Sequence, residues 1–485
     1  MISDEAKRVL SDLNPWWGDP PRIRPEPPAY LRRSIRELVE RLRKPRGLIE
    51  VIRGPRQVGK TTAIYQAIQQ LIHGGLEGRD ILFIRFDLEL LRREPHVLRE
   101  TFRWYADEVR RRPADEGQPP RVFLDEIHKL PDWSEEVKHL FDTFAPRMML
   151  TGSSSVLVAQ GGRESLAGRT FTTELPPFSF REVLEAWWPH VARPLPPRIR
   201  FLDAFEGRLR EFAQAYQGLK PQQKLAIHRH LERYFARGGY PRLHSGEVED
   251  DRWADYLVET VFENVLGADI PTLFPVQNPE LLRSLYLWIA RHTGQEISQG
   301  RLAEDLTAAG IPTNQPTVGK YLHYLADALL IREFRRYPLA KRVSARVPSK
   351  IALSDLGVRN AIFRDTPSLF ESDPGRLGPL VETLVQACIR DHNLRVYYYR
   401  DFEDPKNRRS RVAEVDFVAE RVDGTVLPIE VKFRKRIDPD DLFGVEQFQK
   451  RFEAPLSVVV TRDLYAWMER ERVLFLPMDA FLLAF

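Results

Sequence analysis

The chain of 485 residues contains very little cysteine and no long apolar run. Its single cysteine, Cys388, excludes an internal disulfide and any zinc site built from several cysteines. Because Cys388 lies in an apolar helical pattern, we expect a small core residue rather than a nucleophile. No run of about 18 apolar residues is present, and residues 1–7 lack the apolar core of a secretion signal. We therefore expect a cytoplasmic protein with no membrane partner.

Lysine is also scarce, since 14 of the 73 basic residues are lysine and 59 are arginine. The net charge of +4 and the pI near 9.0 are mild. Arginine suits bidentate contacts with phosphate groups, which points towards nucleic acid. However, a high arginine content together with 37 prolines is equally typical of a GC-rich or heat-adapted genome. Composition alone leaves both explanations open.

The strongest local pattern lies between residues 48 and 62, where a β-branched run leads into G-x-x-x-x-G-K-T and then a helical pattern. In such a loop, glycines let consecutive backbone N–H groups point into one concavity, and the following helix adds its positive end. This arrangement predicts a nucleotide-binding site. The residues expected to form it are Gly54, Pro55, Arg56, Gln57, Val58, Gly59, Lys60, Thr61 and Thr62.

The pattern also predicts roles for individual residues, with ATP and Mg²⁺ as the ligands. Lys60 is expected to bridge the β- and γ-phosphates, and the hydroxyl of Thr61 to take a position on Mg²⁺.

A second set of polar residues follows two apolar strands. Residues 119–126 read as a strand that ends in Asp125 and Glu126. Because ligands bind at the carboxyl ends of parallel strands, we expect Asp125 near Mg²⁺, and Glu126 to orient or deprotonate the attacking water. The next strand, 147–152, is followed by three serines that could reach the γ-phosphate. Sequence does not decide among them, and Ser153 is the candidate.

Several segments together resemble a known family. In chain order they are GPRQVGKTT (54–62), LDEIHKL (124–130), LTGSS (150–154), LAGR (166–169) and LPPFSFRE (175–182). They are similar to the prokaryotic AAA-type ATPases that carry a C-terminal DUF4143 region. The resemblance implies that Asp125 and Glu126 form the second nucleotide motif and that Ser153 lies at the sensor position.

The same resemblance suggests a role for Arg169 and an assembly. Arg169 would stabilise charge on the nucleotide, either in its own subunit or in a neighbouring one; a surface arginine without a role is the alternative. The resemblance also implies a homo-oligomeric ring, for example a hexamer.

Residues 279–337 predict three helices followed by a strand, which is the plan of a winged helix. The third helix is expected to bury Val318, Leu322, Leu325 and Leu329 and to leave Thr317, Lys320, Tyr321 and Tyr324 partly outward. Between positions 332 and 350 the chain has seven basic residues and one acid, a stripe suited to phosphates. Such modules bind either DNA or proteins. The candidate DNA contacts are Lys320, Arg335, Arg336, Lys341, Arg342, Arg408 and Arg409.

The last region resembles the core of PD-(D/E)xK nucleases. Asp416 lies on one expected strand, Glu430 and Lys432 share a face of the next, and Glu382 lies on a preceding helix. The resemblance implies that the acids hold Mg²⁺ and that Lys432 steers the attacking water. Val415 stands where the usual pattern has proline. Alternating charges on an exposed strand are the simpler explanation, and a fold kept for DNA binding without cleavage also stays open.

The expected fold class is α/β: a P-loop parallel sheet of the AAA type with a helical lid, then a winged helix and a PD-(D/E)xK-like domain. The expected domains are an N-terminal arm and helix (1–46), the ATPase core (47–185), the lid (186–275), the winged helix (276–347) and the nuclease-like domain (348–485).

The leading hypothesis for function is an ATP-hydrolysing, DNA-binding motor or remodeller that acts on branched or structured DNA. One alternative is an ATP-regulated, Mg²⁺-dependent nuclease in repair or defence. The other is a signalling switch in which the nucleotide gates partner binding without translocation.

Overall fold

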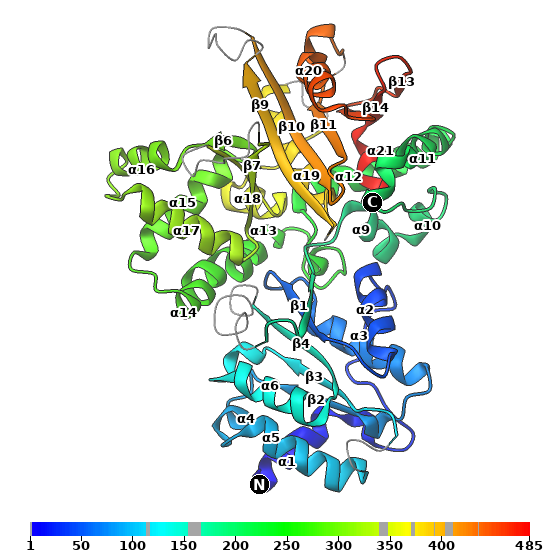
Figure 1. The fold of residues 1–485 in the computed structure, drawn as a ribbon, viewed down its shortest axis with the longest axis vertical. Coiled ribbons are helices and arrows are strands. Elements are labelled where there is room, and N and C mark those ends of the chain that lie inside the picture. Colours follow the sequence, from blue (N-terminus) through cyan, green and yellow to red (C-terminus); the bar gives the residue numbers. More distant parts are fainter. Residues whose placement is uncertain are drawn as a thin grey trace. The chain divides into compact units, whose positions relative to one another are not determined.

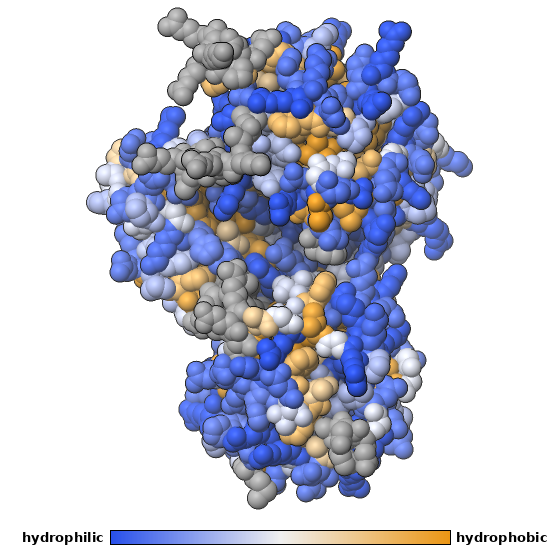
Figure 2. All heavy atoms as spheres, viewed as in Figure 1, coloured by the Kyte–Doolittle hydropathy of each residue, from blue (hydrophilic) through white to orange (hydrophobic). Residues whose placement is uncertain are grey.

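The computed structural model describes residues 2–112, 117–153, 166–338, 348–369, 374–391, 393–402, 411–434 and 436–485. The chain divides into two compact units, Met1–Pro176 and Pro177–Phe485, which are called here the N-terminal and C-terminal units. None of the described helices is both long and apolar enough to cross a membrane. The surface seen in Figure 2 is largely hydrophilic, with smaller apolar areas.

The N-terminal unit is built on a parallel sheet whose five described strands have the order β2-β3-β4-β1-β5. Its helices and strands are α1 Asp4–Leu13, α2 Arg33–Arg43, β1 Ile49–Gly54, α3 Lys60–His73, β2 Ile81–Arg85, α4 Glu89–Arg93, α5 Val97–Trp104, β3 Arg121–Asp125, α6 Trp133–Phe144, β4 Arg147–Ser153 and β5 Thr170–Glu174.

The strands of this sheet carry apolar side chains through their middle parts, as expected for parallel strands covered on both faces. Ile84 on β2, Leu124 on β3 and Leu150 on β4 are completely buried in one core cluster. The parallel arrangement places the ends of β1, β3 and β4 at the same edge of the sheet, as expected from the sequence.

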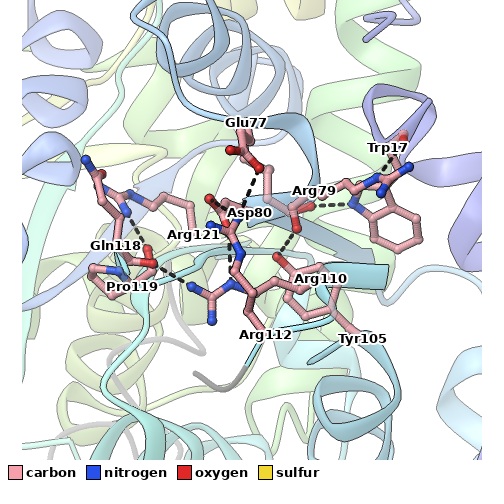
Figure 3. Close-up of polar contacts among 11 residues, drawn as sticks. Trp17, Glu77, Arg79, Asp80, Tyr105, Arg110, Arg112, Gln118, Pro119 and Arg121 are labelled. Carbon is pink, nitrogen blue, oxygen red and sulfur yellow. Dashed lines mark hydrogen bonds and ion pairs between the residues drawn. The ribbon is translucent and has the colours of Figure 1, made fainter. Parts of the chain in front are cut away.

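The outer strand β2 is held at its amino end by a polar cluster around Asp80 (Figure 3). The guanidinium of Arg110 lies 2.8 Å from Asp80 Oδ1, and Arg112 contacts both Asp80 and Glu77 at 3.0–3.1 Å. The Nε1–H of Trp17 donates to the carbonyl of Ile81 at 2.7 Å. The N-terminal arm is thereby attached to the sheet.

The C-terminal unit contains a mixed sheet whose nine described strands have the order β13-β14-β12-β11-β10-β9-β7-β8-β6. Its helices and strands are α9 Phe180–Trp187, α10 Pro189–Ala192, α11 Arg208–Gln217, α12 Pro221–Arg237, α13 Trp253–Leu257, α14 Ile270–Leu273, α15 Pro279–Arg291, β6 Gln295–Ile297, α16 Gln299–Ala308, α17 Gln315–Asp327, β7 Ile331–Arg336, β8 Ser349–Leu353, α18 Leu356–Phe363, α19 Pro374–Cys388, β9 Leu394–Phe402, β10 Val412–Arg421, β11 Val426–Lys432, α20 Phe443–Phe452, β12 Ser457–Thr461, β13 Ala466–Met468, β14 Val473–Pro477 and α21 Met478–Ala484.

The two faces of this sheet pack against different helices, as the alternation of side chains along a strand requires. Phe417 and Ile429 face the core shared with α19 and α21, whereas Val418 and Val426 face α20. Figure 1 shows β9 and β10 as a long antiparallel pair with α20 beside it. Cys388 lies in the core, as expected, and burial raises the pKa of its thiol to about 12.

The three helices α15, α16 and α17 are followed by β7 and β8, and β8 pairs antiparallel with both β7 and β6. On α17, Val318, Leu322 and Leu325 are buried as expected, but Tyr321 and Tyr324 are buried as well. Leu329 was expected on the same buried face, but it lies beyond the end of α17 and is half-buried. The expectation that these tyrosines point outward was wrong. The hydroxyl of Tyr321 instead accepts the backbone N–H of Asn278 at 3.0 Å, and the ring of Tyr324 stacks on Phe274.

The helices assigned to a lid, residues 186–275, have their described core contacts in the C-terminal unit. Phe212 of α11 and Phe235 of α12 share one cluster with Phe481 of α21. The assignment of these helices to a lid of the nucleotide-binding domain stays a prediction.

Candidate functional site

The loop between β1 and α3 has the backbone that its glycines predict. Gly59 has a φ of 95°, in the left-handed region that other residues avoid. Gly54 is required for a different reason, because a Cβ there would lie 2.4 Å from the carbonyl oxygen of Leu175. Together they let the chain curl tightly from the strand into the helix.

Lys60 begins α3 and is 8% exposed. Its Nζ donates to the carbonyl oxygens of Gly54 and Pro55, each at 3.0 Å. These contacts with backbone oxygens orient the ammonium at the start of the helix. An anionic group such as a phosphate therefore suits this position.

Asp125, at the end of β3, accepts hydrogen bonds from two threonines on other elements. The hydroxyl of Thr61 on α3 donates to Oδ2 at 2.8 Å, and the hydroxyl of Thr151 on β4 donates to Oδ1. Because β4 lies between β1 and β3 in the sheet, Thr151 is placed beside Asp125. Sequence reasoning missed Thr151, although its position at the end of a buried strand was a usable signal.

The carboxyl of Asp125 is almost fully buried, and burial raises its pKa. The hydrogen bonds from Thr151 and Thr61 and the charge of Lys60 act in the opposite direction. A bound cation would favour the ionised form further. Carboxylate and hydroxyl oxygens are ligands that Mg²⁺ accepts, so Asp125 and Thr61 fit the metal that the sequence predicts.

Glu126 follows directly and has a φ of 53°, which is unusual for a residue with a side chain. Its backbone N–H donates to the hydroxyl of Thr151 at 3.2 Å, which helps to hold this conformation. The carboxylate is half-buried, and His128 Nε2 lies 3.5 Å from its Oε2. Backbone strain of this kind concentrates at functional sites, where it aims a side chain.

Ser153 and Arg169 lie at opposite edges of the sheet. Ser153 ends β4 beside Gly54, at the loop edge, although its side chain lies outside the described residues. Arg169 precedes β5, and its carbonyl accepts the backbone N–H of Ile49 at the start of β1. The guanidinium makes a bidentate pair with Asp142 at 2.9–3.0 Å. A strand length of roughly 17 Å therefore separates Arg169 from its own loop, so a role in its own site lacks geometric support.

The acids expected for the nuclease-like site come together in the C-terminal unit. A β-bulge interrupts the pairing of β10 with β9 between Val415 and Val418 and includes Asp416. The backbone N–H of Asp416 donates to Glu430 Oε2 at 3.1 Å, and that of Val431 donates to Asp416 Oδ2 at 2.9 Å. Lys432 is paired with Glu430.

The fifth member of this cluster, Lys350 on β8, was not expected. Its Nζ lies 2.7 Å from Asp416 Oδ1 and 2.6 Å from Glu382 Oε2. In the sequence, Lys350 is the last basic residue of the stripe expected to contact phosphates. That reading was wrong for this residue, because Lys350 is 4% exposed and its charge is directed inward.

The electrostatics of the cluster follow from burial and from the two ammonium groups. Burial raises the pKa of Glu430 to about 8 and that of Glu382 to about 7. Burial also tends to raise the pKa of Asp416. The positive charges of Lys350 and Lys432 outweigh this effect, so the pKa of Asp416 is lowered. Among the described residues no group of three or more metal-ligating side chains is arranged to hold a metal ion. Because the ammonium of Lys350 lies between Asp416 and Glu382, the cluster does not fit the Mg²⁺ that the nuclease resemblance implies.

The candidate DNA contacts have varied surroundings. Lys320 is exposed, with its Nζ 5.7 Å from the ring centre of Tyr324, and Arg335 is exposed on β7. Arg336 is half-buried and lies 3.7 Å from Asp401. Lys341, Arg342, Arg408 and Arg409 lie outside the described residues.

The loop, the strand order and the Thr61–Asp125 contact define a P-loop domain of the AAA type. A family model described as "AAA domain" matches residues 47–184, and the DUF4143 model, a domain of unknown function, matches residues 377–481. The chain thus carries an AAA domain and a DUF4143 domain, which confirms the resemblance seen in the sequence. A further domain of unknown function, DUF8612, matches residues 228–369.

Two curated relatives extend over much of the chain. An uncharacterized protein of Haemophilus influenzae is 22% identical over 391 residues, which cover 79% of this chain and 82% of the relative. An uncharacterized protein of Methanocaldococcus jannaschii is 23% identical over 283 residues, or 58% of this chain and 55% of that protein.

Two solved structures are similar at low TM-scores. One is the Aeropyrum pernix ORC1 protein in complex with DNA, with a TM-score of 0.30 and 14% identity, covering 70% of this chain and 94% of that one. The other is C. elegans PCH-2, with a TM-score of 0.26 and 14% identity, covering 51% of this chain and 62% of that one. Scores at this level do not establish a relationship in function.

Proposed function

We propose that the chain is a Mg²⁺-dependent ATPase whose hydrolysis cycle acts on bound DNA. The observation that carries the enzymatic part is the junction of Thr61, Asp125 and Thr151 at the loop edge of the sheet. This junction combines a phosphate-binding loop with two oxygen ligands suitable for a cation. Glu126 lies next in the chain and supplies a carboxylate at the same edge.

Each residue of the site has a distinct task in this proposal. The backbone N–H groups of residues 54–62 and the ammonium of Lys60 bind the phosphates, while Thr61 and Asp125 hold Mg²⁺. The metal, when bound, neutralises charge on the phosphate oxygens. Glu126 orients a water and accepts its proton, and the hydrogen bond from its backbone to Thr151 holds it in register with Asp125.

DNA is the proposed partner on the basis of the C-terminal unit. The helices α15, α16 and α17 with the strands β6, β8 and β7 fit a winged helix. Lys320 on α17 and Arg335 on β7 present exposed basic side chains from this module. We propose further that the chain forms a homo-oligomeric ring and acts as a motor or remodeller on branched or structured DNA.

One experiment tests both parts. ATP hydrolysis is measured with single-stranded, duplex, forked and four-way DNA, and DNA cleavage is scored on the same samples. The proposal predicts hydrolysis that DNA accelerates, most strongly with a branched form, and no nicking. Lys60→Ala provides the matched control, because it removes the phosphate contact without changing the C-terminal unit.

The other outcomes distinguish the alternatives. Hydrolysis that no form of DNA changes would favour a nucleotide-gated switch, and metal-dependent nicking would favour a nuclease. Absence of any hydrolysis by a folded, nucleotide-bound protein would overturn the enzymatic part itself.

A further inference from the structure

The acidic cluster of the C-terminal unit consists of Glu382, Asp416, Glu430, Lys432 and Lys350. We propose that Lys350 is an internal ammonium that closes this cluster in place of a divalent cation. The cluster then holds the fold together and binds no catalytic metal. This inference concerns the metal alone and does not depend on DNA as the partner.

The position of the Lys350 ammonium is the first argument. Its Nζ lies 2.7 Å from Asp416 Oδ1 and 2.6 Å from Glu382 Oε2, so it stands between the two carboxylates that a bridging metal would need. The remaining oxygen of Asp416 accepts the backbone N–H of Val431 at 2.9 Å. Both oxygens of Asp416 therefore already have partners within the chain.

Burial is the second argument. Lys350 is 4% exposed, and its Nζ lies 5.0 Å from the ring centre of Phe417. A metal could bind Asp416 and Glu382 only if the ammonium moved away, and two positive ions this close would repel each other strongly in a buried site. Moving the lysine out would also leave a cavity and break the packing of β8.

Charge balance is the third argument. Lys432 pairs with Glu430 on the other side of the cluster, so each of its three carboxyl groups has an ammonium partner, while the charge of Glu414 acts on the cluster from nearby. A divalent cation is favoured where carboxylates face one another without compensation, and here the two lysines supply part of that compensation.

The cluster also joins distant parts of the fold. Lys350 is on β8, Glu382 on α19 and Asp416 on β10, while α19 packs against β11 (Figure 1). These ion pairs connect the small group of strands β6, β8 and β7 to the larger part of the same sheet. Carboxylates that resemble a nuclease site thus have a structural use in this chain.

The test measures Mn²⁺ binding by electron paramagnetic resonance on the full, nucleotide-free chain. We expect the parent protein and Asp416→Asn to bind equal amounts of Mn²⁺, because any ion at the nucleotide site is unaffected by that change. In Lys350→Met the carboxylates lose their internal cation. This variant should bind an additional Mn²⁺ ion and should be stabilised by it, and the double variant Lys350→Met with Asp416→Asn should lose that ion.

The overturning result is an ion that the parent binds and that both Asp416→Asn and Glu382→Gln lose. That comparison needs only the parent and two near-isosteric variants. It therefore tests whether the cluster binds a metal ion even if Lys350→Met fails to fold. A parent whose melting temperature rises with Mn²⁺ and falls with a chelator, in a manner that Asp416→Asn abolishes, would overturn the proposal equally.

Discussion

Thr151 and Asp125 are joined through their side chains, with the threonine hydroxyl donating to Oδ1 of the carboxylate. Asp125 ends β3 and Thr151 lies near the end of the neighbouring strand β4, and the same hydroxyl accepts the backbone N–H of Glu126. One side chain therefore contacts the carboxylate of Asp125 and the backbone of Glu126, the two acids that the proposed reaction uses. Removing it should affect the reaction more than nucleotide binding.

We predict that Thr151→Val lowers the rate of ATP hydrolysis by about ten- to a hundredfold, the usual effect of about 1–3 kcal/mol for a lost buried hydrogen bond. Affinity for a fluorescent nucleotide should change little, because Lys60 and the loop stay intact. Thr143→Val is the matched control, since Thr143 is exposed on α6. Hydrolysis by Thr151→Val at the parent rate would remove Thr151 from the mechanism.

Arg169 should act on a neighbouring subunit or not at all, because it lies at the edge of the sheet opposite to its own loop. Arg169→Ala and Lys60→Ala should each be inactive alone, and mixing them should restore part of the hydrolysis, since each subunit supplies what the other lacks. Asp142→Asn is the control for the loss of the ion pair. Confirmed mixed oligomers without any recovery would leave Arg169 as a surface residue.

Arg335 is exposed on β7 and should contact a DNA phosphate. Arg335→Glu should weaken binding at low salt and reduce the slope of log affinity against log salt by about one. Arg470→Glu, a charge reversal at another exposed position of the same unit, should leave the slope unchanged. Equal slopes for the parent and Arg335→Glu would exclude Arg335 from the interface.

The buried imidazole of His244 should make the stability of the C-terminal unit depend on pH. Burial lowers its pKa from 6.5 to about 4, its Nε2 bonds the carbonyl of Gly238 at 2.8 Å, and no described residue bonds its buried Nδ1. The unfolded chain therefore binds the proton more tightly than the folded one. Between pH 6.5 and pH 4 the free energy of unfolding should fall as pH falls, by up to about 3 kcal/mol.

The measurement compares denaturant unfolding of the parent and His244→Gln across that range. Arg233, Arg237 and His230 lie near the ring and are unchanged in the variant, so the difference between the two curves isolates His244. Parallel curves would mean that His244 is not held neutral by the fold.

The parts of the molecule that local sequence determines were predicted well. The phosphate loop needs glycines, a lysine and a threonine at fixed spacing, and the same short segment carries all of them. Asp125 at the end of β3 and Glu126 directly after it were identifiable because the apolar part of the strand leads into them. The AAA domain model matches residues 47–184, which include both segments.

Other contacts between distant residues were not predicted, although the grouping of Glu382, Asp416 and Glu430 was. Lys350 and Asp416 are 66 positions apart, and no pattern around Lys350 indicates that it turns inward. Tyr321 and Tyr324 were placed outward because they lie beside an already complete apolar face, whereas residues of other elements cover them. In each case the residue that makes the contact belongs to another part of the chain. The spacing of apolar residues along one helix or strand carries no information about such a contact.

The most direct test of the account is the fate of bound ATP in Glu126→Gln. The glutamine keeps the size of the side chain but cannot accept a proton from water, so ATP and Mg²⁺ should bind with parent affinity while release of phosphate in a single turnover falls by at least about a hundredfold. Lys60→Ala should instead lose nucleotide binding. Release of phosphate by Glu126→Gln at the parent rate would contradict the central claim that this edge of the sheet is the site of ATP hydrolysis.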